Sequence, residues 1–346
     1  MARLDFFTVI REAWASYDGS MKIKAIFDVS AQVSTNHVFK VTFEARNPVF
    51  AKLSYYGKYE HFHEDHIIIN NLANNLEAPY DNFLARSLVK KNDVFIYRYM
   101  DDGTEAWVIF YNPIRIKKKM PRRLNNNHIV QMGHEMALFH KACMNVRNTL
   151  PESSKTLTTD INFLTCHIEG PNSRVLNGYE DMVRKQCDTF LENIEKLNYE
   201  SFPKLPVFVD WNIGNFSVTH DGKFHSRWDY DWFRVSSRVL DFYFFSRVVS
   251  DIGDRTVFSY VVETFTEERF EKFLLSYHNT FPLSYSEILF LKEAYRFFIL
   301  NYVIKDGRHF FNEVYANKLQ KEAYEVYFPE LDKRFNAEKL LKVLKI

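Results

Sequence analysis

The dipeptide Asn112-Pro113 divides the sequence into two parts of different character. Before it, four short segments are typical of strands: residues 38–43, 49–54, 93–100 and 106–111. The first of them alternates apolar and polar residues, as a half-buried strand does. Proline has no N–H to donate to a β-ladder, so the sheet must end there. Beyond it, apolar residues recur at helical spacing, for example over residues 129–140 and 179–194. The pattern predicts an α+β fold with two lobes.

The N-terminal lobe is expected to span residues 1–112 and to hold an antiparallel sheet, with helices over residues 4–16 and 59–75. A larger, mainly helical lobe is expected over residues 113–346, and Pro329 is expected to separate its last two helices. A chain of 346 residues is long enough to build a core in each lobe. Ligand sites favour clefts between such units, so we expect function between the lobes.

Charge and cysteine content limit the class of function. The 45 Lys and Arg residues nearly balance the 44 Asp and Glu residues, which leaves no basic excess for a nucleic-acid partner. The basic run over residues 115–123 is interpreted as a solvated loop. Cys143, Cys166 and Cys187 lack metal-ligand spacing and allow no disulfide framework. Without a signal peptide or an apolar run of ~20 residues, we expect a cytoplasmic protein with no membrane partner.

Three oxygen-bearing side chains follow short apolar strands between residues 206 and 245. Asp210 precedes a turn, Asn215 follows it closely, and Asp229 comes after a hairpin that turns at Asp221-Gly222. Two carboxylates and an amide are donors that Mg²⁺ accepts beside phosphate oxygens. Asp210 is also placed to accept the proton of a hydroxyl nucleophile. Each residue alone is more often a turn residue, but their spacing favours the active centre of a phosphotransferase.

Lys52 interrupts an otherwise apolar strand. Because lysine is rarely buried without a partner, a partner is expected. The functional partner is a nucleotide phosphate, with Glu64 on the next helix orienting the ammonium group. Glu60 is the rival for that role. The alternative is a lysine on the solvent-exposed face of the strand.

Taken together, these residues resemble the aminoglycoside phosphotransferase and choline kinase family, small-molecule kinases with a protein-kinase-like fold. The family's catalytic loop reads His-Gly-Asp, then four residues, then Asn, and residues 208–215 read Phe-Val-Asp-Trp-Asn-Ile-Gly-Asn. The family's apolar-Asp-aromatic-acid signature matches Trp-Asp-Tyr-Asp at residues 228–231. The remaining matches, in chain order, are Lys52, the helix signature at residues 132–140, and the Arg-x-x-Asp pattern from Arg238 to Asp241.

The resemblance implies a two-lobed kinase that transfers the γ-phosphoryl group of ATP to a hydroxyl of a small molecule, of the aminoglycoside, amino alcohol or sugar type. It implies Asp210 as the catalytic carboxylate and Asn215 and Asp229 as Mg²⁺ ligands. It also implies that Lys52, paired with Glu64, holds the nucleotide phosphates.

The same resemblance implies that backbone groups of residues 108–113 receive the adenine. It implies mainly structural roles for His140, Arg238 and Asp241. The nucleotide-covering turn at residues 34–37 has no glycine, so the hydroxyls of Ser34 and Thr35, with backbone N–H groups, are expected to meet the phosphates.

The catalytic loop departs from the family pattern at Phe208 and Val209, which replace His and Gly. Phenylalanine fills the same space but cannot form the hydrogen bonds of histidine, so a second hypothesis is a catalytically weak kinase fold that binds a nucleotide or a partner. A protein kinase is disfavoured, because the short distance from Asp229 to Asp241 leaves little room for an activation segment.

The sequence offers two groups of residues that could bind the acceptor molecule, and each group also has a structural interpretation. Aromatic residues after the metal aspartate can cage a quaternary ammonium group or belong to the core: Tyr230, Trp232, Tyr243 and Phe244. A group of acidic residues can bind amino groups of a sugar or cap helices: Asp251, Asp254, Glu267 and Glu268.

Overall fold

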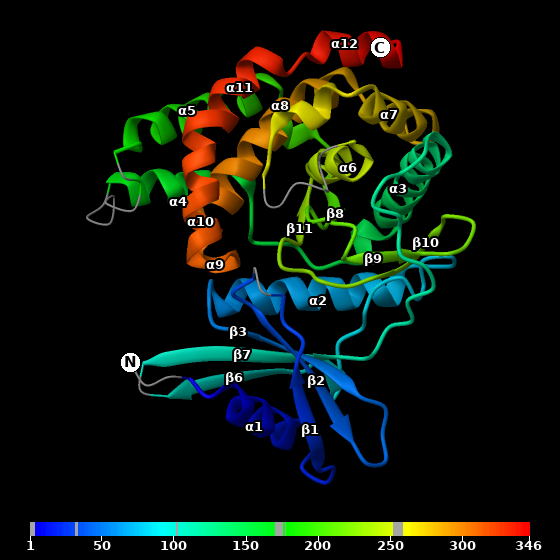
Figure 1. Cartoon of the computed structure of the whole chain (residues 1–346), viewed down its shortest axis with the longest axis vertical. Coiled ribbons are helices and arrows are strands. Elements are labelled where there is room, and N and C mark those ends of the chain that lie inside the picture. Colours follow the sequence, from blue (N-terminus) through cyan, green and yellow to red (C-terminus); the bar gives the residue numbers. More distant parts are fainter. Residues whose placement is uncertain (1–3, 32–33, 102, 170–175, 177, 252–258) are drawn as a thin grey trace.

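The computed structural model describes residues 4–31, 34–101, 103–169, 176, 178–251 and 259–346. A β-sheet and a larger helical region occupy opposite ends of the molecule, and helix α2 (Tyr59–Asn75) lies between them (Figure 1). The predicted α+β, two-lobed architecture is confirmed.

The sheet is five-stranded, with the antiparallel order β1-β2-β3-β7-β6. Its strands are β1 (Ile23–Asp28), β2 (His37–Phe43), β3 (Val49–Ser54), β6 (Ile96–Asp101) and β7 (Thr104–Tyr111). The alternation in β2 buries Phe39 and Val41 in one core together with Ile10 and Trp14 of α1 (Phe6–Asp18). Strand β3 is central, and it places Lys52 between β2 and β7.

Helix α2 precedes Pro113 in the sequence but packs with the helical region. Its Ile68, Ile69 and Leu72 are buried in the same core as the helices that follow residue 113. The core of the sheet, by contrast, is a separate cluster. The inner face of α2 is therefore fixed by the helical lobe, and this decides where its polar side chains point.

The helical region contains α3 (Asn126–Val146), α4 (Leu157–Glu169), α5 (Glu180–Lys196), α6 (Phe242–Val249), α7 (Glu268–Thr280), α8 (Tyr285–Phe298), α9 (Gly307–Phe310), α10 (Glu313–Glu322), α11 (Phe328–Arg334) and α12 (Ala337–Leu344). Helices α3 and α7 approach closely at Gly133, where a Cβ would collide with the carbonyl oxygen of Phe273. No helix among the described residues is both long and apolar enough to cross a membrane.

The expected break at Pro329 is wrong. Pro329 lies in the first turn of α11, directly after the π-helical residues Ala323–Tyr327, so the chain stays helical on both sides of it. The last two helices separate instead after α11, where Asn336 caps α12 by accepting the N–H of Lys339 at 3.0 Å.

Three short antiparallel pairs complete the fold. They are β4 (Val89–Lys90) with β5 (Asp93–Val94), β8 (Leu205–Val207) with β11 (Arg234–Ser236), and β9 (Phe216–Val218) with β10 (Phe224–Arg227). The last two pairs carry the predicted site residues on the loops at their ends.

Candidate active site

Asp210 lies on a loop directly after β8, and this loop is strained. Val209 has a φ of +58°, a left-handed conformation that is an outlier for a β-branched residue. The buried carboxylate of Asp241 holds it, because its Oδ1 accepts the N–H of Phe208 at 3.0 Å and that of Val209 at 2.6 Å. Nε2 of His140 in turn lies 3.0 Å from Oδ2 of Asp241. A buried pair therefore fixes the loop that presents Asp210.

The carboxylate of Asp210 is close to that of Asp229 and partly buried. Its Oδ1 accepts the N–H of Asn212 at 3.0 Å. Burial raises the pKa of Asp210 to about 7, and the negative charge of Asp229 adds to the rise. A carboxylate that titrates near neutrality is suited to accept the proton of a hydroxyl nucleophile.

Asn215 and Asp229 flank the β9–β10 hairpin. The N–H of Trp228 donates to the carbonyl of Asn215 at 3.0 Å, which keeps the two predicted metal ligands at the same end of the hairpin. Asp229 has a φ of +68° and a side chain that is 39% exposed. Nδ2 of Asn215 is 3.5 Å from the carbonyl oxygen of Asp210, so the amide oxygen is directed away from that contact.

A cavity of about 540 Å³ lies between the sheet and the helical region, and both predicted metal ligands line it. Its apolar lining comprises Val29, Val38, Phe50, Ala85, Ile114 and Ile116, and its charged end holds Lys52, Asp229 and Asp231. Tyr111 and Asn112, from the predicted adenine-binding segment, also line it. No group of three or more His, Cys, Asp and Glu side chains in the described ranges is suited to hold a metal unaided. An amide oxygen and a carboxylate fit Mg²⁺ that takes its other ligands from phosphates.

Lys52 is buried at the charged end of this cavity and pairs with two carboxylates. Its Nζ lies 3.0 Å from Oδ1 of Asp229, and it also pairs with Asp231. Burial lowers the pKa of Lys52, but the two negative charges outweigh burial and raise it above its usual value. The expected pair of Lys52 with Glu64 is wrong. The rival Glu60 lies 3.8 Å from Arg98 instead.

Glu64 is tied to the helical region. Its carboxylate accepts the hydroxyl of Ser153 and the N–H of Ser154, both at 2.8 Å. The neighbouring Asp65 pairs with Lys155 at 2.6 Å. Residues four apart share a helix face, so burial of Ile68 in the helical core turns Glu64 toward that lobe. This is the physical reason why the predicted pair does not form.

The turn that was expected to cover the nucleotide contacts helix α9. The hydroxyl of Thr35 donates to the carbonyl of His309, and the N–H of Thr35 donates to that of Phe310 at 3.3 Å. Oγ of Ser34 accepts the N–H of Asn36 at 3.0 Å. The polar groups of Ser34 and Thr35 therefore have protein partners in this structure, although Ser34 still lines the cavity of about 540 Å³.

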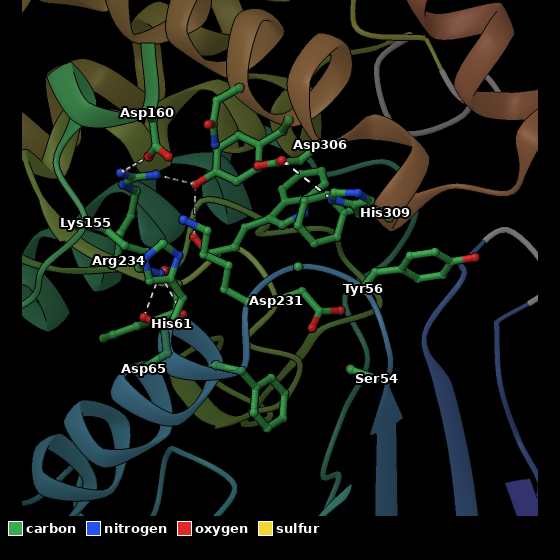
Figure 2. A pocket seen from close by; sticks show the side chains of 18 of the residues that line it. Ser54, Tyr56, His61, Asp65, Lys155, Asp160, Asp231, Arg234, Asp306 and His309 are labelled. Atoms are coloured by element: carbon green, nitrogen blue, oxygen red, sulfur yellow. Dashed lines mark hydrogen bonds and ion pairs between the residues drawn. The ribbon is translucent and has the colours of Figure 1, made fainter. Parts of the chain in front are cut away.

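A second cavity, of about 660 Å³, adjoins the first, and Asn36, Tyr230 and Asp231 line both. Asp160 and Arg234 lie on one side of this second cavity, and Asp306 and His309 on the other (Figure 2). Nδ2 of Asn36 donates to Oδ2 of Asp231 at 2.7 Å at the boundary of the two cavities. Asp210 lines neither of them.

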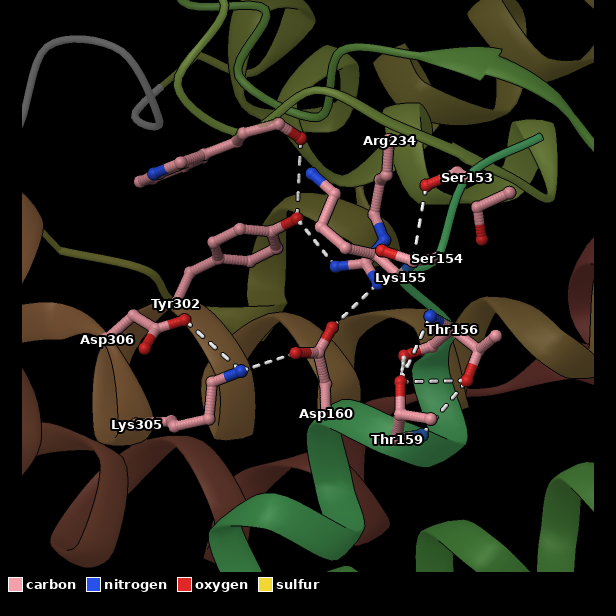
Figure 3. A network of polar contacts seen from close by, with 12 residues as sticks. Ser153, Ser154, Lys155, Thr156, Thr159, Asp160, Arg234, Tyr302, Lys305 and Asp306 are labelled. Carbon is pink, nitrogen blue, oxygen red and sulfur yellow. Dashed lines mark hydrogen bonds and ion pairs between the residues drawn. The ribbon is translucent and has the colours of Figure 1, made fainter. Parts of the chain in front are cut away.

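The wall of the second cavity is a network of paired charges (Figure 3). Asp160 pairs with Arg234 at 2.7 Å and with Lys305 at 2.5 Å. Arg234 also donates to the hydroxyl of Tyr302 at 3.3 Å. Burial raises the pKa of Asp160, but the two cations outweigh burial and lower it to about 2. The wall therefore presents fixed charges of both signs.

The aromatic residues after Asp229 divide between the core and the second cavity. Tyr243 and Phe244 are core residues, 2% and 0% exposed. Trp232 lines the second cavity and stacks on Tyr302, with ring centroids 4.9 Å apart. Tyr230 lines both cavities, and its hydroxyl donates to a backbone carbonyl at 3.0 Å.

The acidic residues considered as an amine site do not converge on these cavities. Glu267 accepts the N–H of Asp251 at 3.0 Å, and Glu268 stands in the first turn of α7. These are helix-end roles. Asp254 lies outside the described residues.

Sequence reasoning missed the site roles of Asp231, Asn36 and Arg227. Asp231 belongs to the matched signature at residues 228–231, so its position two residues after Asp229 was an available signal. Asn36 stands in the predicted nucleotide turn. Arg227 ends a hairpin strand, and nothing in its spacing indicated that the rings of Phe208 and Trp211 bury its guanidinium group.

No family model and no curated protein matches the sequence. Among solved structures, the amicoumacin kinase hAmiN in complex with AMP-PNP, Ca²⁺ and Ami has a TM-score of 0.65 at 13% identity, over 98% of this chain and 98% of that chain. A microcompartment-associated aminopropanol kinase has a TM-score of 0.57 at 14% identity, over 92% and 94%. Choline kinase LicA from Streptococcus pneumoniae has a TM-score of 0.53 at 13% identity, over 94% and 99%. The chain therefore has the two-lobed fold of these small-molecule kinases.

Proposed function

We propose that this chain transfers the γ-phosphoryl group of ATP to a hydroxyl of a small molecule. One observation carries the proposal: Lys52, Asn215 and Asp229 line a single cavity between the lobes, and the side chain of Arg227 contacts the backbone carbonyls of both Asp210 and Asp229. Phosphoryl transfer requires a metal site, a cation for the phosphates and a group that orients the hydroxyl. The fold, shared with kinases of small molecules, supports the same function.

The cavity of about 540 Å³ is the proposed nucleotide site. Its apolar wall suits the adenine ring, and Lys52, Asn215 and Asp229 lie at the end where the phosphates would be. Asn215 and Asp229 would hold Mg²⁺, which, when bound, neutralises charge on the phosphate oxygens. Complexes of one structural neighbour with AMP-PNP and Ca²⁺ agree with this assignment. Lys52 must exchange Asp229 and Asp231 for phosphate oxygens.

Asp210 is the proposed base. The acceptor hydroxyl forms a bond to the γ-phosphorus, the bond from that phosphorus to the bridging oxygen of ADP breaks, and Asp210 takes the hydroxyl proton. The cavity of about 660 Å³ is the proposed acceptor site, because it meets the nucleotide cavity at Asp231. Aminoglycosides, amino alcohols and sugars are the acceptor types to test, since its wall offers charges of both signs and an aromatic face.

A thermal-shift screen of these three acceptor classes, in the presence of Mg²⁺ and AMP-PNP, identifies acceptors without requiring turnover. Phosphoryl transfer to each hit is then measured with ATP. We expect Asp210→Asn to lower kcat by about 10²- to 10⁴-fold, because the proton acceptor is lost, while the melting temperature and nucleotide affinity are retained. Unchanged turnover in Asp210→Asn would rule out the proposed role.

The second candidate is a nucleotide-binding module with little turnover. Two observations favour it: Asp210 lines neither cavity, and Lys52 already neutralises Asp229. The same screen separates the candidates. A binding module is stabilised by nucleotide but transfers phosphate to none of the acceptors, whereas rapid transfer to any acceptor excludes it.

A further inference from the structure

Arg227 places a fully buried guanidinium group between the proposed catalytic and metal-binding residues. The residue ends β10 and is 0% exposed. Its Nη2 donates to the carbonyl oxygen of Asp210 at 3.0 Å and lies 3.5 Å from that of Asp229. One side chain therefore contacts the backbone of both residues, although they come from different loops.

Two aromatic rings enclose the guanidinium. Its carbon lies 4.5 Å from the centroid of the Phe208 ring and 4.2 Å from that of Trp211. Aromatic faces attract a desolvated cation. Nε and Nη1 have no hydrogen-bond partner among the described residues. The carbonyls and ring faces thus replace water only in part, and burial of this charge costs stability.

The backbone of Arg227 is fixed as firmly as its side chain. Its N–H donates to the carbonyl of Phe83 at 2.6 Å, and its carbonyl accepts the N–H of Ala85 at 2.9 Å. These bonds attach β10 to the segment that leads into the sheet lobe. The guanidinium therefore reaches Asp210 and Asp229 from an anchored position.

We propose that Arg227 is a positioning residue that holds Asp210 and Asp229 at a fixed separation, and that Phe208 is its ring partner. The proposal rests on the proposed function, because it concerns the geometry of that site. Phe208 suits the role because its ring offers a negative face to the guanidinium, whereas a protonated histidine at this position would repel it. Phe208, which stands where the family pattern has histidine, is then paired with Arg227 of the β9–β10 hairpin.

If this role is correct, removing the guanidinium group should lower activity but leave the stability of the fold nearly unchanged. An apolar side chain of similar volume often serves a buried site as well as a charged one, or better. A structural role predicts that loss of the guanidinium destabilises the fold. A positioning role predicts that the fold tolerates the loss while turnover falls.

Arg227→Met and Arg227→Lys test this role, with Phe139→Leu as the matched control. Phe139 lies on α3 and packs on the same two rings, with centroids 6.0 Å from Phe208 and 5.9 Å from Trp211. We expect Arg227→Met to lower kcat by about 10- to 100-fold with a change in Tm of no more than about 3 °C. The kcat of Arg227→Lys should lie between those of wild type and Arg227→Met, since lysine keeps the charge but lacks the planar guanidinium group.

The control should lose Tm and keep kcat within about twofold. A kcat of Arg227→Met within about twofold of wild type overturns the proposal. So does a loss of kcat that follows the loss of Tm across all three variants. Should Arg227→Met fail to fold, Arg227→Lys carries the same comparison with the control.

A second measurement does not depend on turnover. The factor by which Mg²⁺ increases the affinity for ADP depends on how Asp229 is positioned to bind the metal. We expect this factor to be at least about fivefold smaller in Arg227→Met than in wild type. It should not change in Phe139→Leu. An unchanged factor in Arg227→Met overturns the proposal. If wild type phosphorylates no acceptor, the proposed function fails, while this measurement still decides the role of Arg227.

Discussion

The left-handed backbone of Val209 costs of order 1–3 kcal/mol, and the structure shows what offsets this cost. Asp241 accepts two N–H groups from Phe208 and Val209, and its other oxygen meets His140. The loop is thus held through its backbone. The side chain at position 208 supplies none of these hydrogen bonds, so phenylalanine at this position is compatible with the observed loop conformation.

His66 makes the stability of the fold depend on pH. Its Nε2 lies 2.6 Å from the hydroxyl of Tyr111, and burial lowers its pKa from 6.5 to about 3. As the pH falls, His66 is therefore protonated in the unfolded chain before it is protonated in the folded one. The contribution of neutral His66 is complete above pH 6.5 and is lost on acidification.

We expect His66 to reduce the free energy of unfolding by up to about 1.4 kcal/mol for each pH unit below 6.5. Urea unfolding at a series of pH values between about 7.5 and 5 measures this slope. The comparison is His66→Gln, which has no titrating group and should show a shallower slope. Equal slopes in the two proteins would contradict the assignment to His66.

The sequence was informative where spacing alone brings residues together. Asn215 and Asp229 were predicted to share a site because a short hairpin joins them, and they line one cavity. Partners across the fold were not predictable in this way. Lys52 has Asp229 and Asp231 rather than Glu64 as partners, since the direction of Glu64 depends on the packing of α2 against helices that follow much later.

At the scale of elements, Lys155 connects three of them. It precedes α4, pairs with Asp65 of α2 at 2.6 Å, and donates to the carbonyl of Phe233 at 2.8 Å. Phe233 belongs to the segment that runs from Asp229 into β11. Lys155 therefore links α2 to the segment that begins at Asp229, one of the two proposed metal ligands.

Lys155→Met should destabilise the fold by about 3–5 kcal/mol at pH 8, because it leaves the Asp65 carboxylate buried without its cation. Burial raises the pKa of Asp65 to about 6 even with Lys155 beside it, and this pKa rises further when the cation is removed, so the penalty should shrink as the pH falls from 8 toward 6. Urea unfolding of wild type and Lys155→Met at pH 8 and at about pH 6 measures both effects.

The double variant Asp65→Leu with Lys155→Met removes both charges and should recover most of the loss. Lys196→Met is the control for a surface pair, since Lys196 and Glu192 are 69% and 67% exposed. It should change stability by no more than about 0.5 kcal/mol. A loss in Lys155→Met no larger than that of this control would show that the link is not stabilising.

Elements with strong local signals were predictable. Strand β3 has the predicted bounds, and α8 begins with the capping box formed by Ser284 and Glu287. Pro329 was misread, because proline ends a helix from its interior but is tolerated in a first turn. Sequence alone did not reveal that a new helix begins there directly after the preceding helical segment.

At the scale of the whole molecule, three contacts join the sheet lobe to the helical lobe beside the cavity of about 540 Å³. Thr35 contacts α9, Asn36 contacts Asp231, and Lys52 pairs with Asp229. The last contact matters most for ligand binding, because the cation occupies the carboxylate that would bind the metal. Under the proposed function, the metal and Lys52 would compete for Asp229 until phosphates are present to accept Lys52.

This competition predicts that metal and nucleotide bind cooperatively. Phosphates that draw Lys52 away free Asp229 for Mg²⁺, and they supply further oxygen ligands themselves. We expect the affinity for Mg²⁺ to rise by at least about tenfold when ADP is bound, a coupling of about 1.4 kcal/mol, and by reciprocity the affinity for ADP must rise equally with Mg²⁺. Isothermal titration of each ligand, with and without the other, measures both arms of the cycle.

The variant Lys52→Met distinguishes two causes of this cooperativity. One is competition between Lys52 and the metal for Asp229, and the other is only that the phosphates supply ligands to the metal. Without the ammonium group, Asp229 is free in the unliganded protein, so the variant should bind Mg²⁺ alone more tightly than wild type and show a smaller coupling to ADP. Its affinity for ADP alone should fall, since the phosphates lose their cation. Lys40→Met on neighbouring β2 is the control and should leave all these affinities unchanged. If Mg²⁺ binds wild type and Lys52→Met equally well without nucleotide, Lys52 does not compete for Asp229, and the ion pair between them has no part in metal binding.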